Sequence, residues 1–167
     1  MLTRVQLIAA GESFDCVLGV DTALRVTHAA RSHTVHETRR NFAEPFKTTT
    51  RTTVTTVANG HGFDIAQLVV RDAIPLGDPE AQISIALRKP EGLARAKDGE
   101  EVAVEMDGDG KDVKVRWSKV EDGKGGEKDG MYEWVCGIAA GKKVQLEAQW
   151  DVKAPESTRW EESPHMK

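Results

Sequence analysis

The stretch KTTTRTTVTTVANGHGFDIAQLVVRDAIP, residues 47–75, decides the fold class of this chain. Residues 47–57 are almost all β-branched, and such side chains favour an extended backbone over a helix. Residues 64–73 carry apolar side chains on both alternating sets, which is typical of a central strand covered on both faces. The NGHG segment between them, residues 59–62, tolerates the positive φ of a tight turn. We therefore expect the two strands to pair as an antiparallel hairpin, with Pro75 ending the second strand.

Short alternating segments continue on both sides of this pair. Their apolar residues recur at every second position and turn signals separate them, as in antiparallel strands with one buried face. The further expected strands cover residues 3–8, 13–18, 24–28, 82–88, 101–106, 111–117, 131–138 and 142–152. No segment shows a sustained helical period. The sequence therefore predicts an all-β fold of two packed antiparallel sheets, an immunoglobulin-like or fibronectin-like sandwich, with large core residues Trp117, Trp134 and Trp150.

The chain length suits one domain, which we expect to span residues 1–155. Residues 29–46 are polar and basic with few apolar anchors, so we expect an exposed arm or hairpin tip there. The glycine-rich segment DGKGGEKDG, residues 122–130, predicts a flexible loop, and residues 156–167 a disordered tail. A strand pattern that begins almost at Met1 is typical of a piece excised from a longer protein.

Composition excludes some classes of partner. The net charge is −4 and both signs are interspersed, so no basic stripe favours nucleic acid. No apolar run approaches the roughly 20 residues of a membrane span, and the first residues lack the apolar core of a secretory signal. We expect a soluble, cytoplasmic protein that binds neither nucleic acid nor a membrane interior.

The two cysteines, Cys16 and Cys136, each occupy an apolar position of an expected strand. Two buried thiols acting as small hydrophobic residues is the simpler interpretation. A disulfide between facing sheets is the alternative, and it would imply an oxidising compartment. Neither cysteine has a neighbour at the spacing of a zinc site or a thiol catalyst.

The basic segment supplies the candidate binding residues, which could meet an acidic partner or an anionic surface. They are Arg31, His33, His36, Arg39 and Arg40. Metal binding is not expected, because on one strand the side chain that would share a face with His33 belongs to Val35.

Other motifs point to structure rather than chemistry. In DGDGKD, residues 107–112, Asp112 and Ser118 stand where a calcium loop requires glycine and a carboxylate, so a turn is expected. Arg71 and Asp72 point to opposite faces of a strand, and we expect an ion pair with another strand that fixes the register. The GKGG segment lacks the context of a phosphate-binding loop. No catalytic triad or dyad is evident, so we predict no enzyme activity, cofactor or metal.

Several motifs together resemble a known family. They are GESFDCVLGVD (residues 11–21), a Thr-rich strand ending in Asn59, VVRDAIPLGDPEAQISI (residues 69–85), and a Trp-bearing strand followed by GKK (residues 141–143) and a closing strand. This order resembles the C-terminal part of mucoidy inhibitor A-like proteins, although DVKAP (residues 151–155) lacks their usual aromatic before the proline. The resemblance implies a β-rich domain that follows an N-terminal region with a coiled coil. It implies no established activity and transfers no functional residue.

The sequence favours a non-enzymatic β-sandwich interaction module from a larger multi-domain protein. It would bind a protein partner, the N-terminal region of its parent chain or a second copy through exposed strand edges or loops. The alternative is a carbohydrate- or polysaccharide-binding module, which exposure of Trp117 or Trp160 on a sheet face would favour and burial of both would oppose. A hydrolase would need a pocket of convergent carboxylates or histidines that the sequence does not predict.

Overall fold

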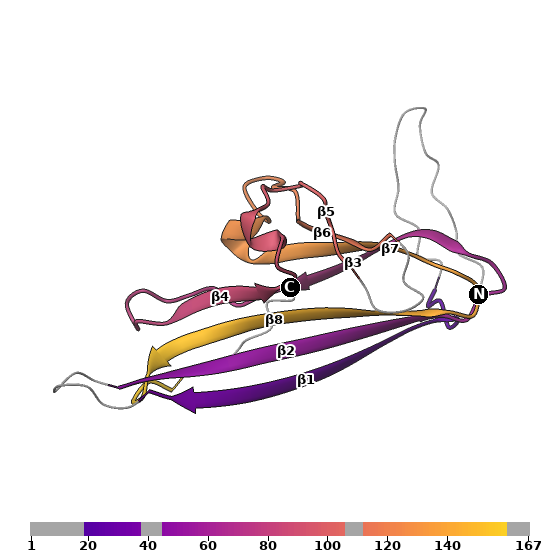
Figure 1. Cartoon of the computed structure of the whole chain (residues 1–167). Helices are drawn as coiled ribbons and strands as arrows, with labels where there is room; N and C mark the ends of the chain where they lie inside the picture. Colours follow the sequence, from indigo (N-terminus) through magenta and orange to yellow (C-terminus); the bar gives the residue numbers. More distant parts are fainter. Residues whose placement is uncertain (1–18, 38–44, 106–111, 160–167) are drawn as a thin grey trace.

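The computed structural model describes residues 19–37, 45–105 and 112–159 (Figure 1). Eight strands and two short 3-10 helices lie within these residues. They are β1 (Leu24–His36), β2 (Phe46–Asn59), β3 (Ile65–Ala73), β4 (Ser84–Lys89), η1 (Leu93–Arg95), β5 (Val102–Ala103), β6 (Lys114–Trp117), η2 (Glu127–Asp129), β7 (Met131–Ile138) and β8 (Lys143–Pro155). The predicted all-β class is confirmed.

The strands form two antiparallel sheets of four strands each. The first has the order β1-β2-β8-β4 and the second the order β3-β7-β6-β5. Figure 1 shows the two sheets as separate layers, with the long strands β1, β2 and β8 beneath β3 and β7. The predicted two-sheet sandwich is therefore correct.

The core between the sheets is built around aromatic side chains. The rings of Trp117 and Tyr132 meet edge to face at 6.5 Å, and those of Tyr132 and Trp134 at 6.1 Å. This geometry is favoured by the ring quadrupoles. The indole N–H of Trp117 donates to the carbonyl of Leu93 at 2.8 Å, which satisfies its one polar group. Trp150 is also buried, as the alternation predicted.

The prediction that residues 47–75 form an antiparallel hairpin is wrong. β2 pairs with β1 on one side and β8 on the other, so neither of its edges is open to β3. β3 lies in the second sheet beside β7 and is an edge strand rather than a central one, with Val69 39% exposed. The chain crosses between the sheets after Asn59, whose side chain hydrogen-bonds to carbonyl groups at the end of β7.

The strand expected to end near His28 continues to His36, so the first part of the expected arm is a strand. β1 keeps one register against β2 from Leu24 opposite Asn59 to His36 opposite Lys47. The apolar alternation does not extend into this half of β1, because both of its faces are exposed. The rest of the expected arm includes residues 38–44, which lie outside the described residues.

Several predicted elements lie outside the described residues. They are the strands at residues 3–8 and 13–18, the turn after residue 106 and the end of the tail. Cys136 is a buried free thiol, in agreement with the simpler interpretation of this cysteine, whereas Cys16 lies outside the described residues. In the glycine-rich segment, η2 follows Gly126, whose N–H donates to Ser118 Oγ at 2.8 Å.

The expected ion pair across strands is present at the open edge of the second sheet. Arg71 Nε donates to Glu133 Oε1 on β7, and Arg116 Nε on β6 donates to Glu133 Oε2, both at 2.9 Å. Burial alone would raise the pKa of Glu133, but the hydrogen bonds from Arg116 and Arg71 hold it below its usual value. Asp72, on the opposite face, accepts a hydrogen bond from the hydroxyl of Tyr132.

Candidate functional site

The four edge strands of the two sheets differ in how well they are protected against a further strand. β5 has two residues, and the registers of β3 and β4 each contain a shift. β4 also carries Arg88 and Lys89, which pair with carboxylates of β8. β1 has thirteen residues in one unbroken register and contains no proline or lysine. Short length, an irregular register, proline and lysine are among the devices that block edge pairing, and β1 is the edge in the described part of the chain that has none of these four.

The hydrogen-bonding direction of β1 follows from its two ends. The carbonyl of Ala23 accepts from Gly60 N–H, and Glu37 N–H donates to the carbonyl of Phe46, both at 2.8 Å. In an antiparallel pair the bonded positions alternate, so odd-numbered residues of β1 bond to β2. The even-numbered residues direct their N–H and C=O groups away from the sheet. The described part of the chain offers no partner for these groups in Val26, His28, Ala30, Ser32, Thr34 and His36.

The predicted binding residues on β1 lie on opposite faces of the strand. Arg31 and His33 lie on its outer face, whereas His36 lies on the inner face, which is continuous with the core side of β2. Arg39 and Arg40 are outside the described residues. All five lie within the segment expected to be an exposed arm or hairpin tip, because an exposed strand without apolar alternation resembles a loop in sequence.

Charge on β1 has one sign. The sequence LRVTHAARSHTVH contains two arginines and three histidines but no carboxylate. His36 Nδ1 lies 2.9 Å from both carboxylate oxygens of Glu156, and His28 Nδ1 lies 3.0 Å from Thr55 Oγ1. The strand therefore presents a polar, basic edge.

The carboxylate of Asp21, which is not among the predicted binding residues, fixes the start of β1. Asp21 Oδ1 accepts from the backbone N–H groups of Ala23 and Leu24, and Asp21 Oδ2 lies 2.9 Å from His61 Nε2. The hydrogen bond from His61 lowers the pKa of Asp21, with help from the N–H of Ala23. The His61 ring stacks on Phe63 at 4.6 Å. Asp21 is the last residue of the GESFDCVLGVD motif (residues 11–21), which is the signal in the sequence that points to this position.

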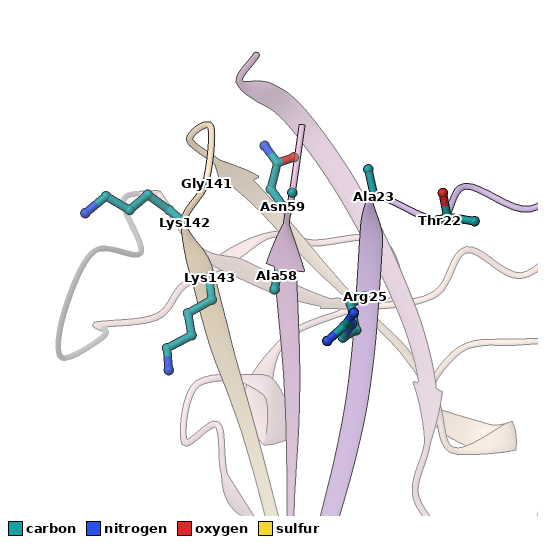
Figure 2. A pocket seen from close by; sticks show the side chains of 9 residues that line it. Thr22, Ala23, Arg25, Ala58, Asn59, Gly141, Lys142 and Lys143 are labelled. Carbon is teal, nitrogen blue, oxygen red and sulfur yellow. The ribbon is translucent and has the colours of Figure 1, made fainter. Parts of the chain in front are cut away.

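A cavity of about 620 Å³ lies at this end of the sheet (Figure 2). Arg25 and Lys143 flank the small side chain of Ala58, while Lys142 is directed away from Arg25. The amide of Asn59 is already engaged by the carbonyl groups of Phe63, Ile138 and Ala139. The cavity thus brings two exposed cations near each other without a buried donor, and we assign no ligand to it.

The described residues contain neither a cluster of metal ligands nor a helix that could span a membrane. No group of three or more His, Cys, Asp or Glu side chains among residues 19–37, 45–105 and 112–159 could hold a metal ion. In the same residues, no helix has the length and apolarity to cross a membrane. The larger cavity of about 850 Å³ contains Glu101 and Lys114, which pair with each other at 2.8 Å.

Comparisons with known proteins identify no relative: no family model, curated protein or solved structure matches this chain. The assignment to the mucoidy inhibitor A-like family stays a prediction from the motifs.

Proposed function

We propose that this domain is a non-enzymatic interaction module that binds an extended protein segment along the edge of β1. The observation that carries the proposal is the unbroken register of this thirteen-residue strand, whose outward backbone groups have no partner among the described residues. An added strand would supply those partners, and main-chain hydrogen bonds provide affinity in this mode of recognition.

Charge favours an acidic partner segment. β1 has no carboxylate, so glutamate or aspartate at alternate positions of an added strand would face its arginines and histidines. A second copy would instead bring Arg25, Arg31 and three histidines of one strand beside the same set of its partner. We therefore favour a segment of different sequence over pairing between two copies.

The segment would belong to a partner protein or to the N-terminal region of a longer parent chain. The second source accompanies the proposed membership in the mucoidy inhibitor A-like family, in which this domain follows another region. An immunoglobulin-like or fibronectin-like assignment and a cytoplasmic location are further parts of the proposal. The two antiparallel sheets support the first of these.

Carbohydrate binding has less support. Stacking on sugars requires exposed aromatic rings, and Trp117, Trp134 and Trp150 are all at most 5% exposed. Trp160, the other candidate, is outside the described residues. An exposed tryptophan platform is therefore missing from the part of the chain that the structure describes.

The test uses two substitutions of Ala30, an exposed residue whose N–H points outward. Ala30→Pro removes this N–H without removing a bond to β2, whereas Ala30→Val keeps it. Proteins captured from the native cell extract by the wild-type domain are identified by mass spectrometry. The captured protein is then purified, and its binding to each variant is measured.

The proposal expects binding by the wild type and Ala30→Val, and at least a tenfold loss with Ala30→Pro, since several main-chain bonds depend on a continuous edge. It also expects slower amide hydrogen exchange at Val26, His28 and Ser32 in the complex. Equal binding by a folded Ala30→Pro domain, or unchanged exchange at these amides, would show that the partner binds elsewhere.

A further inference from the structure

A further cavity, of about 600 Å³, lies on the inner face of the first sheet near the end of β1. Its floor consists of paired residues of β1 and β2, and residues 158–159 line its side. The floor pairs are Ser32 with Arg51, Thr34 with Thr49, and His36 with Lys47. An inner face of a sandwich is normally apolar, as it is in β8 at Val144 and Leu146, so this polar section requires another explanation.

Cations dominate the lining of this cavity. Lys47, Arg51 and Arg159 contribute positive charge, and no aspartate or glutamate is among the described residues that line the cavity. The nearby carboxylate of Glu156 is bound to His36 at 2.9 Å. The cavity therefore favours an anion.

The ammonium group of Lys47 is held in place by the chain itself. It donates to the carbonyl oxygens of Glu156 at 3.1 Å and Thr158 at 2.8 Å. An ammonium group has three donors, so one N–H remains for a ligand. Both acceptors are neutral carbonyl groups, so the positive charge is not neutralised by them.

Hydroxyl groups supply further donors. Thr34 Oγ1 and Thr49 Oγ1 lie 2.9 Å apart, and Thr49 is only 6% exposed. Since one of the two hydroxyls donates to the other, the accepting hydroxyl keeps its own proton for a ligand. Ser32 and Thr158 add two more hydroxyls to the lining.

We propose that this cavity binds a phosphoryl group, through the cations of Lys47, Arg51 and Arg159 and the hydroxyls around them. A phosphoryl group has several acceptor oxygens and about two negative charges at pH 7, so it suits several cations and hydroxyl donors better than one carboxylate does. The cavity at the opposite end of the sheet lacks this combination, because its lining includes one hydroxyl residue, Thr22.

Two sources of this group are compatible with the site: free phosphate and a phosphorylated side chain. The second source rests on the proposed function. Ser32, Thr34 and His36 line the cavity and also direct their backbone groups outward, so an added strand at β1 would place its inner-face side chains beside the cavity. A phosphoserine at such a position would then combine strand pairing with phosphate recognition.

The test titrates the domain with inorganic phosphate and, separately, with O-phosphoserine, while amide shifts are followed by two-dimensional NMR. Unmodified serine is the negative control. The double variant Lys47→Gln/Arg159→Gln removes two cations of the cavity. Lys97→Gln/Arg95→Gln removes the same charges at exposed positions elsewhere and is the matched control. Arg159→Gln alone replaces the double variant if that variant does not fold.

The proposal expects saturable shifts at Ser32, Thr34 and Thr49, weakened about tenfold by loss of the cavity cations and unchanged in the matched control. Tighter binding of O-phosphoserine would identify a phosphorylated side chain as the ligand, and equal or tighter binding of phosphate would identify the free anion. Absence of saturation, or equal affinity in the double variant, would overturn the site. Ala30 does not line the cavity, so the Ala30→Pro variant should still bind phosphate. Loss of partner binding in this variant can therefore be distinguished from loss of the phosphate site.

Discussion

Asn59 Nδ2, at the end of β2, lies 3.0 Å from the carbonyl oxygen of Ile138, at the end of β7 in the opposite sheet. The same amide group lies within hydrogen-bonding distance of the carbonyls of Phe63 and Ala139, and Asn59 Oδ1 accepts from His61 N–H. Asn59 is 1% exposed. One buried side chain therefore joins the two sheets at the point where the chain crosses between them.

Asn59→Asp tests this link, because a carboxylate oxygen replaces the amide donor and faces three carbonyl oxygens. We expect a loss of about 3 kcal/mol or more in the free energy of unfolding, from a buried, unpaired charge. Urea denaturation measures this change. Gln145→Glu makes the same chemical change at an exposed position of β8 and should stay within about 0.5 kcal/mol of wild type. Similar losses in both variants would contradict the role of Asn59.

Glu133 should make the stability of the domain depend on pH. Its pKa is lowered in the folded state, so its contribution is present above the unfolded value of about 4.3 and is lost as pH falls through the folded value. Between pH 7 and pH 3 the free energy of unfolding should therefore fall more steeply in wild type than in Glu133→Gln. Glu91→Gln, at an exposed position, should keep the wild-type slope. A Glu133→Gln slope equal to that of wild type would show that Arg71 and Arg116 do not stabilise the charged form.

Asp21 should control fraying at the start of β1. Asp21→Ala removes the acceptor for the Ala23 and Leu24 N–H groups, so amide exchange at Ala23 and Arg25 should become several-fold faster. Asp21→Asn keeps an acceptor oxygen and should have a smaller effect. The comparison separates the hydrogen bonds of Oδ1 from the charge that faces His61. Equal exchange in both variants would assign the effect to charge alone.

Adjacent proline substitutions test the direction of the backbone groups of β1. Ala29 lies at a position bonded to β2 and Ala30 at one that faces outward, and both side chains are exposed. Ala29→Pro should cost about 3 kcal/mol, while Ala30→Pro should cost much less because it removes no sheet bond. Thermal unfolding measures both variants. A larger loss for Ala30→Pro would reverse the assigned alternation and remove the basis of the proposed binding edge.

The sequence by itself determined the fold class and the inward face of the core strands. In residues 143–155 the alternation of Val144, Leu146, Ala148 and Trp150 is strict, and each of these side chains is buried. The tryptophans on β6, β7 and β8 were likewise placed correctly. Burial has a period of two along a strand, so these features are local and can be recognised without knowing which strand is the neighbour.

Only the tertiary structure decided which strands pair and where the exposed edge lies. The Thr-rich segment pairs with β1 and β8 instead of the next strand along the chain, because alternation specifies a buried face but not the neighbour that covers it. β1 has no apolar period in its second half, so its continuation depends on hydrogen bonds to β2. For the same reason, the separation of Arg31 and His33 from His36 onto opposite faces became visible only when that pairing was known.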